Sequence, residues 1–192
     1  MPDAFEVLAE DHAEVKQMLN ELESTPGHSA GATEAVLAAR KRLAQRLVME
    51  SSRHEAAEEQ YFWPTVRDRL GCGNQLADEA IGQEGQAKDV LTKLDKLDAA
   101  DPEFDKLLGE LIPAGRQHIE FEESRVWPGL RQVLTEAQAS ELGEQLQKAK
   151  EQGPTRPHPH TPANPTVQKA AGPVVAAADR LRDAATGRGR SS

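Results

Sequence analysis

Two stretches of this chain carry histidine and glutamate at the same spacing. The first reads HEAAEEQYFWP at residues 54–64, and the second reads HIEFEESRVWP at residues 118–128. In both, a glutamate follows the histidine by four residues, and the stretch ends in Trp-Pro. Residues four apart lie on one face of a helix, one turn apart. Imidazole nitrogens and carboxylate oxygens are ligands of divalent iron, manganese and zinc, so the repeat indicates metal chemistry.

The two pairs, His54 with Glu58 and His118 with Glu122, lie on apolar stripes that should face a core. Burying a carboxylate without a partner is costly, and no Lys or Arg occupies these stripes. Bound cations would supply the missing positive charge, and each carboxylate has two oxygens with which to bridge. The repeat therefore predicts a pseudo-symmetric site for two ions. A single His-x-x-x-Glu is often a solvated surface pair, an alternative that two copies on inward stripes disfavour.

Two more residues complete the predicted ligand set. His12 lies on the apolar stripe of the first helical segment, four residues after Leu8. When residues 12–22 are aligned with residues 84–94, Glu84 corresponds to His12. The alternatives are that His12 is a structural core histidine and that Glu84 is a solvated glutamate. The predicted metal ligands, three histidines and three glutamates, are His12, His54, Glu58, Glu84, His118 and Glu122.

Other residues in the repeated stretches are expected to have supporting roles. Glu59 and Glu123 directly follow the paired glutamates and lie about 100° further around the helix. That position suits contacts behind the ligands or with solvent. Tyr61 and the two tryptophans, Trp63 and Trp127, are expected to pack in the core rather than to act as redox partners.

Periodicity and capping residues predict the helices that position these groups. Pro113 lies inside the fourth of them and is expected to kink or split it. Four long helices with short joints predict an all-α, antiparallel up-down four-helix bundle with an additional C-terminal helix. No strand pattern competes with this interpretation. The predicted helices are residues 3–24, 33–64 or slightly beyond, 75–97, 101 to past 126, and 135–153.

The last part of the chain differs from the rest. Residues 1–150 form the predicted bundle domain, and residues 151–192 form a Pro-rich linker and a basic tail. Residues 153–165 are too rich in proline to be helical, whereas residues 173–187 suit a short amphipathic helix.

From Gly153 onward the chain holds six Lys or Arg against two Asp. Two alternatives remain for this tail: it is disordered, or it folds back onto the acidic bundle. Whether it has a protein partner is open. His158 and His160 lie in the linker, and no defined site is expected there.

Composition limits the function classes. A net charge of −9 disfavours nucleic acid as a partner, because phosphates repel it. No apolar run approaches the length of about 18 residues that a membrane span needs, and the N-terminus lacks the features of a signal peptide. The single cysteine, Cys72, excludes an intrachain disulfide and fits a reducing compartment. We therefore expect a soluble, cytoplasmic protein without nucleic-acid or membrane partners.

Three motifs resemble one known family. EDH at residues 10–12, HEAAEE at 54–59 and HIEFEE at 118–123 are similar to motifs of the hemerythrin family, specifically the bacterial hemerythrin-like HHE cation-binding proteins. The resemblance covers roughly residues 3–150. It implies an up-down four-helix bundle that holds a non-haem di-iron centre, with two iron ions joined by an oxo or hydroxo bridge.

The resemblance also implies a role for each ligand. His12 and His54 would bind one iron, His118 and a residue of the third helix would bind the other, and Glu58 and Glu122 would bridge. Oxygen-carrying hemerythrins place two histidines on the third helix, and most HHE proteins keep at least one.

This chain departs from that pattern on the third helix. The stretch AIGQEGQAKDVL contains no histidine. Glu84 takes the matching place, and Lys88 stands one turn on, where a second histidine would be. A carboxylate donates more negative charge than imidazole and should favour the ferric state. The departure argues against reversible oxygen carriage and toward centres that react with oxygen or peroxide.

The sequence therefore predicts a protein that binds, senses or reacts with a small oxidant, namely dioxygen, peroxide or nitric oxide. Two alternatives are an oxidoreductase with catalase-like or peroxidase-like turnover and a metal-storage or structural bundle. Whether the protein is an enzyme stays open at this point.

Overall fold

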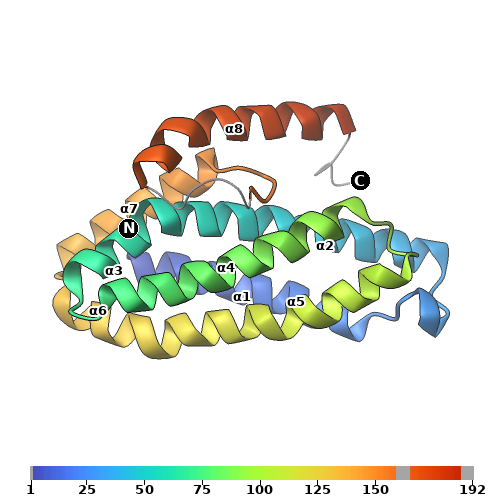
Figure 1. Cartoon of the computed structure of the whole chain (residues 1–192), viewed down its shortest axis with the longest axis horizontal. Helices are drawn as coiled ribbons and strands as arrows, with labels where there is room; N and C mark the ends of the chain where they lie inside the picture. The colour runs from blue at the N-terminus through green and yellow to red at the C-terminus, as the bar shows by residue number, and fades with distance from the viewer. Residues whose placement is uncertain (1, 159–164, 187–192) are drawn as a thin grey trace.

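The computed structural model describes residues 2–158 and 165–186 of the chain (Figure 1). The described residues are largely helical and contain no strand, which confirms the all-α prediction. Their elements are α1 (Ala4–Ser24), η1 (His28–Ala30), α2 (Glu34–Ala57), η2 (Glu58–Phe62), α3 (Trp63–Arg69), α4 (Gly73–Lys96), α5 (Pro102–Phe121), η3 (Glu122–Val126), α6 (Trp127–Val133), α7 (Glu136–Gln152) and α8 (Pro165–Thr186).

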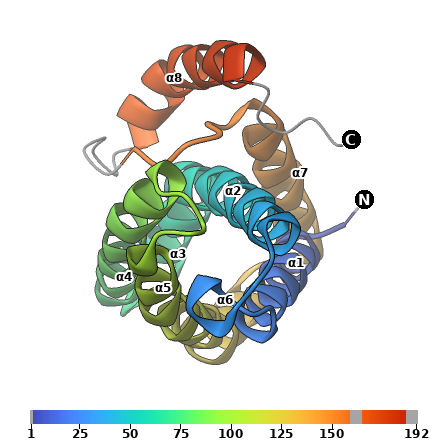
Figure 2. The same cartoon turned by 90° about the vertical axis from the view of Figure 1, so that its right-hand side faces the viewer.

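Helices α1, α2, α4 and α5 form the predicted antiparallel up-down bundle. Seen along the bundle axis in Figure 2, they surround a common centre, and each packs against its neighbours in the ring. Helix α7 packs against α1 and α2, and α8 lies outside the ring, where it contacts α7 and η2. None of the described helices is long and apolar enough to cross a lipid bilayer.

The predicted starts of the first and fifth helices, at residues 3 and 135, are confirmed by capping residues. The carboxylate of Asp3 accepts from the backbone N–H of Glu6, and the Glu6 side chain accepts from the backbone N–H of Asp3. Thr135 and Gln138 form the same reciprocal pair at the start of α7. Each pair satisfies N–H groups that a helix leaves unbonded at its first turn.

The prediction that Pro113 splits its helix is wrong, because α5 runs unbroken from Pro102 to Phe121. Proline removes the hydrogen bond to the carbonyl four residues earlier, which here belongs to Gly109. Both Gly109 and Pro113 are exposed, so water can satisfy that carbonyl. Burial of Leu111 and Ile112, which lie between Gly109 and Pro113, then holds the helix together.

The two repeated stretches share a feature that the periodicity did not predict. After the candidate ligand glutamate, each helix widens into one π-helical turn, η2 and η3. The N–H of Trp63 bonds to the carbonyl of Glu58, and the N–H of Trp127 bonds to that of Glu122.

The Trp-Pro ending explains these wide turns. Pro64 and Pro128 have no N–H, and in an α-helix their rings would clash with the carbonyl four residues earlier. A π turn moves that carbonyl away, and such turns occur frequently at functional sites. Pro64 therefore does not stop the helical path, which continues through α3 to Arg69.

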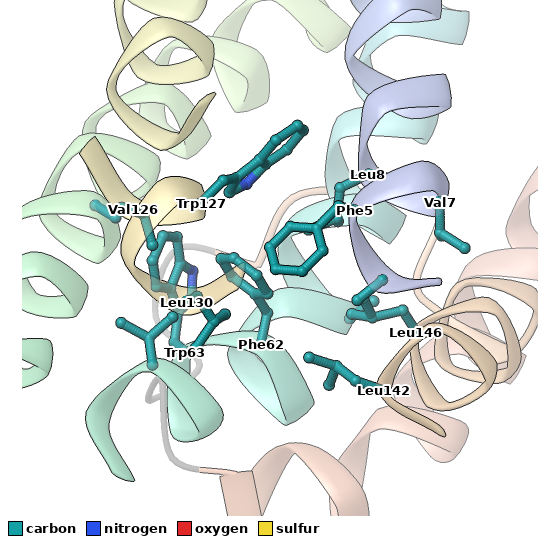
Figure 3. Close-up of a cluster of buried hydrophobic side chains, with 14 of the residues drawn as sticks. Phe5, Val7, Leu8, Phe62, Trp63, Val126, Trp127, Leu130, Leu142 and Leu146 are labelled. Atoms are coloured by element: carbon teal, nitrogen blue, oxygen red, sulfur yellow. The ribbon is translucent and has the colours of Figure 1, made fainter. Parts of the chain in front are cut away.

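The core consists of two apolar clusters, one toward each end of the bundle. The first gathers aromatic and aliphatic side chains including Phe5, Phe62, Trp63 and Trp127 (Figure 3). The second contains Leu and Phe side chains of the opposite half. On each bundle helix one predicted ligand lies between residues of the two clusters: His12, His54, Glu84 or His118. The predicted ligands therefore form a polar layer inside an otherwise apolar core.

Gly143 lets α7 approach the beginning of α1. A Cβ added at Gly143 would lie 2.6 Å from the carbonyl oxygen of Pro2 and 2.9 Å from the backbone nitrogen of Ala4. Because these contacts are to backbone, they cannot be relieved by a side-chain rotation. We expect Gly143→Ala to lower the free energy of unfolding by about 1–3 kcal/mol, measured by urea denaturation.

Gly109→Ala is the matched control. Gly109 lies inside α5, and among the residues that the structure describes nothing is within 4 Å of the added Cβ. This change should raise the free energy of unfolding by about 0.5–1 kcal/mol through helix propensity. Equal effects of the two substitutions would contradict the close packing of α7 on α1.

The described part of the C-terminal segment packs against the bundle. Arg156 bonds to Asp95 of α4 at 2.9 Å and to Asp183 of α8 at 2.7 Å. Helix α8 begins at Pro165, earlier than the expected residue 173. His158 lies 2.9 Å from Asp179, a pairing that the sequence did not indicate, whereas His160 lies outside the described residues.

Candidate metal centre

All six predicted ligands lie in the polar layer at mid-bundle. Helix α1 supplies one of them, α2 and η2 supply two, α4 supplies one, and α5 and η3 supply two. Five are buried, and His118 is half-buried. The side chains that meet there are His12, His54, Glu58, Glu84, His118 and Glu122.

The six residues form two overlapping groups with metal-ligand character. Within each group the ligand atoms lie within 4.8 Å of one another. Glu58 and Glu122 belong to both groups, so each could serve two ions. The first group is His12, His54, Glu58 and Glu122, and the second is Glu58, Glu84, His118 and Glu122.

Glu122 directs one oxygen to each side of the layer. Its Oε2 lies 3.1 Å from Nε2 of His12, and its Oε1 lies 3.1 Å from Nε2 of His118. On the opposite helix, Oε2 of Glu58 lies 3.2 Å from Nε2 of His54. Nitrogens and oxygens at this separation are suited to share one cation.

Many of these atoms are buried and have no hydrogen-bond partner among the described residues. A buried polar atom without a hydrogen-bond partner lowers the stability of a fold by about 1–3 kcal/mol. A cluster of such atoms therefore requires an explanation. Cations bound between them would satisfy them together. The atoms are Nε2 of His12 and His118, both carboxylate oxygens of Glu58 and Glu122, and Oε2 of Glu84. The donor set thus fits bound metal ions.

Each histidine has a hydrogen-bond partner on its other ring nitrogen. An acceptor at Nδ1 keeps the proton there, which leaves the lone pair of Nε2 directed at the layer. The three contacts are His12 Nδ1 to Glu123 Oε1 at 3.0 Å, His54 Nδ1 to Asp11 Oδ2 at 3.1 Å, and His118 Nδ1 to Gln83 Oε1 at 3.0 Å. The role of Glu123 behind the ligands was among those predicted, whereas Asp11 and Gln83 were not identified from the sequence.

Lysines hold two of these acceptors in place. Lys16 bonds to Glu123 at 2.8 Å. Lys150 of α7 bonds to Asp11, so α7 is connected to His54 through one carboxylate. The helix that follows the bundle therefore contributes to the orientation of a candidate ligand.

The two tryptophans pack in the core as predicted, and each also contacts a candidate ligand. Nε1 of Trp63 donates to Oε1 of Glu84 at 2.7 Å, which leaves the second Glu84 oxygen facing the layer. The ring of Trp127 stacks on that of His12, with centroids 5.1 Å apart and planes 13° apart. The alignment of residues 84–94 with 12–22 gave no sign of either contact.

Lys88 does not reach into the layer as a ligand would. It forms an ion pair with Glu59, and its Nζ lies 3.7 Å from Oε2 of Glu55. Burial lowers the pKa of Lys88, but Glu55, Glu84 and Glu59 outweigh it and raise the pKa above the ordinary value. A permanent positive charge therefore stands beside the layer, on the helix that has no histidine.

Burial disfavours every charge in the layer, and neighbouring charges decide which groups ionise. Burial raises the pKa of Glu84 and of Glu58, and the charge of Glu122 raises that of Glu58 further. Burial lowers the pKa of His118, but Glu122 outweighs it and raises the pKa to about 9. The pKa of His54 is likewise raised, by Glu58 and Asp11 against burial. Without metal, protons therefore take the positions that cations would occupy.

Asp11 provides a test of the orienting contacts. We expect Asp11→Ala to weaken metal affinity by about 10–100-fold, because the ring of His54 loses its Nδ1 acceptor. The measurement is competition for metal against a chelator of known affinity. Glu10→Ala, the exposed neighbour on α1, should leave the affinity unchanged. Equal affinities of the two variants would show that Asp11 does not orient His54.

Comparison with known proteins agrees with this geometry. The family model of the Hemerythrin HHE cation binding domain matches residues 3–130. An uncharacterized hemerythrin-like protein of Schizosaccharomyces pombe is 30% identical over 139 residues, which cover 72% of this chain and 68% of that protein. A Hemerythrin HHE cation binding domain-containing protein from Mycobacterium kansasii has a crystal structure that aligns with a TM-score of 0.66 and 21% identity. That alignment covers 99% of this chain and 96% of the other and shows a shared fold.

Proposed function

Because this chain belongs to the hemerythrin HHE cation-binding family, we propose that its polar layer is a non-haem di-iron centre that binds, senses or reacts with a small oxidant. Dioxygen, peroxide and nitric oxide are the oxidants that we consider. The observation that carries the proposal is that Glu58 and Glu122 belong to both groups of ligand atoms. Two ions that share two carboxylates form a coupled pair rather than two separate sites.

The residues divide naturally between the two ions. His12 and His54 would hold one, and Glu84 and His118 would hold the other. The three carboxylates bring three negative charges, which two divalent cations more than neutralise. When bound, iron would supply a site for oxidant binding and electrons for its reduction.

The composition of the donor set supports iron over zinc. Structural zinc sites are usually tetrahedral and closed, with four ligands and often cysteine. Mixed imidazole and carboxylate sets with bridging oxygens suit iron and manganese better. The lone cysteine, Cys72, is exposed and lies outside the layer.

The chain's own residues prepare the layer for this chemistry. Glu123, Asp11 and Gln83 fix the three rings. Five of the six candidate ligands are buried, which strengthens electrostatic interactions within the layer.

Metal analysis with an absorption spectrum tests the proposal. The full chain is loaded with ferrous iron without oxygen, exposed to air and freed of unbound metal. We expect two irons per chain and an absorption band near the ultraviolet edge of the visible, which zinc does not give. His12→Ala and Glu84→Ala should each reduce the iron count, because each removes a ligand of a different ion. About one ion per chain without the band would instead support the storage or structural alternative.

One observation favours the alternative of an oxidoreductase with catalase-like or peroxidase-like turnover. The third carboxylate of the layer, Glu84, is buried, and one of its oxygens has no hydrogen-bond partner within the described part of the chain. A carboxylate-rich centre should favour the oxidised metal after each reaction. Sustained consumption of peroxide by the iron-loaded protein, lost in Glu84→Ala, would support turnover. A single stoichiometric reaction would support binding or sensing.

A further inference from the structure

A cavity of about 370 Å³ adjoins the candidate metal centre. At one end it is bounded by His12, His54, Glu84 and His118. From there it extends toward the second apolar cluster, between all four bundle helices.

The walls beyond the polar end are mainly aliphatic. Leu19 of α1, Leu47 of α2, Leu91 of α4 and Leu111 of α5 all line the cavity, so each bundle helix contributes a leucine. Three of these leucines belong to the best-buried residues of the core, with exposed fractions of 2% or less. A cavity with such walls attracts apolar groups more strongly than water.

The opening of the cavity lies between α4 and α5. Ala114 and Gln117 of α5 and Gln86 of α4 line it and are exposed, and Val90 of α4 lines it and is half-buried. Among the exposed residues that line the cavity, Glu110 alone carries a charge, so the opening suits a neutral organic molecule.

The cavity is larger than a small inorganic oxidant needs. A water molecule takes up about 30 Å³ in the liquid, and a diatomic molecule is of similar size. An apolar cavity of about 150 Å³ is enough to bind benzene. The volume of about 370 Å³ falls in the range of about 300–1,000 Å³ typical of sites for organic ligands.

We propose that this cavity binds a small organic molecule with a compact aromatic or branched-alkyl body and one polar oxygen group. The body lies against the leucines, and the oxygen group points to the unpartnered atoms of His12, Glu84 and His118. The orientation of the oxygen group toward a metal rests on the proposed function, whereas occupation of the cavity does not. The proposal extends the ligand class from inorganic oxidants to organic molecules.

Titration calorimetry with 2-phenyl-2-propanol tests the proposal. This probe has an aromatic body and one hydroxyl, and it undergoes no redox reaction under these conditions. The full chain is used as purified, with its metal content measured. We expect saturable binding at one probe per chain. Absence of saturable binding would overturn the proposal.

Two variants fill the cavity from α4. Ala87 lines it three residues after Glu84, and Val90 lines it six residues after Glu84. We expect Ala87→Leu and Val90→Phe each to weaken probe binding at least tenfold. Ala38→Leu makes the same change as the first variant at an exposed position of α2, and it should leave binding unchanged.

Metal content and thermal unfolding are measured on every variant. If Ala87→Leu loses metal or unfolds, Val90→Phe decides the matter, because it lies further from the ligands. Probe binding that is equal in both filling variants and in Ala38→Leu would overturn the proposal.

A further measurement separates this inference from the proposed function. Addition of the probe to the iron-loaded protein should change the absorption band of the metal pair, and an unchanged band would refute the orientation of the oxygen group. Two irons per chain without probe binding would overturn the cavity proposal alone. Probe binding without iron binding would overturn the di-iron proposal alone.

Discussion

Replacing Glu58 with glutamine is expected to abolish binding of both metal ions and, at the same time, to stabilise the metal-free protein. Glu58 is fully buried and belongs to both ligand groups, so the amide removes a negative oxygen from each ion. Burial and the charge of Glu122 raise the pKa of Glu58, which shows that its charged form is disfavoured in the metal-free fold. A neutral isostere avoids that penalty and should raise the free energy of unfolding by about 1–3 kcal/mol.

Glu59→Gln is the matched control one residue away. Glu59 is also buried, but it pairs with Lys88 and belongs to neither ligand group. We expect this variant to keep both ions and to lose about 1–3 kcal/mol of stability, because a buried ion pair is weakened. The measurements are metal content after loading and urea denaturation in the presence of a chelator. A Glu58→Gln variant that retains two ions, or is less stable than the parent without metal, would contradict the proposed role.

The second large effect is a difference in pH dependence between the metal-free and metal-loaded proteins. A group whose pKa is higher in the folded state stabilises the fold below its unfolded pKa, and that stability is lost as the pH rises through the folded pKa. Two such groups are His118, whose pKa is about 9 against an ordinary value of 6.5, and Glu55, whose pKa is about 7 against 4.5. Between pH 6 and 9 the folded metal-free protein thus binds more protons than the unfolded chain. Its stability should therefore fall over this range.

The size of the fall follows from the pKa values. His118 alone accounts for roughly 3 kcal/mol between its unfolded and folded pKa. In the loaded protein the metal displaces the protons of the ligand histidines, so below about pH 6.5 these histidines bind fewer protons in the native state than in the unfolded chain. Its stability should rise with pH up to neutrality and then level off.

Urea denaturation between pH 5 and pH 9, with and without metal, measures both curves. His118→Gln should flatten the metal-free curve, because it removes one of the groups with a raised pKa. Parallel curves for the two forms would show that the ligands do not exchange protons for metal.

Much of the bundle could be predicted because its signals are local. The reciprocal caps at Asp3 and Thr135 depend on residues three apart. The pairing of His54 with Glu58 follows from helical spacing alone, and the structure indeed places the two side chains together. That these residues bind metal stays a prediction, which the iron count and the Glu58 variant test.

The contacts around the ligands could not be predicted because they join distant segments. Asp11 is next to His12 in sequence, yet it orients His54 of the neighbouring helix. Glu84 receives its hydrogen bond from Trp63, on a different segment. No spacing rule within one helix relates such pairs, since helix packing decides which side chains meet.

The prolines inside the helices differ in their effect on the backbone, and the sequence alone did not distinguish them. Pro113 was expected to kink or split its helix, but α5 is not split, and the carbonyl that Pro113 leaves unbonded belongs to an exposed residue and can reach water. Pro64 and Pro128 directly follow the buried Trp63 and Trp127, six residues after Glu58 and Glu122. There the backbone widens instead. The repeated interval between glutamate and proline was the signal for these turns, although the periodicity did not reveal it.

The arrangement of the indole rings gives the protein a built-in optical reporter. The chain has two tryptophans, and each touches a different half of the centre: Trp63 through Glu84, and Trp127 through His12. A paramagnetic ion at either position would quench the emission of its own neighbour. Single Trp→Phe variants would therefore let intrinsic fluorescence follow the filling of each half separately, in real time and without any added dye.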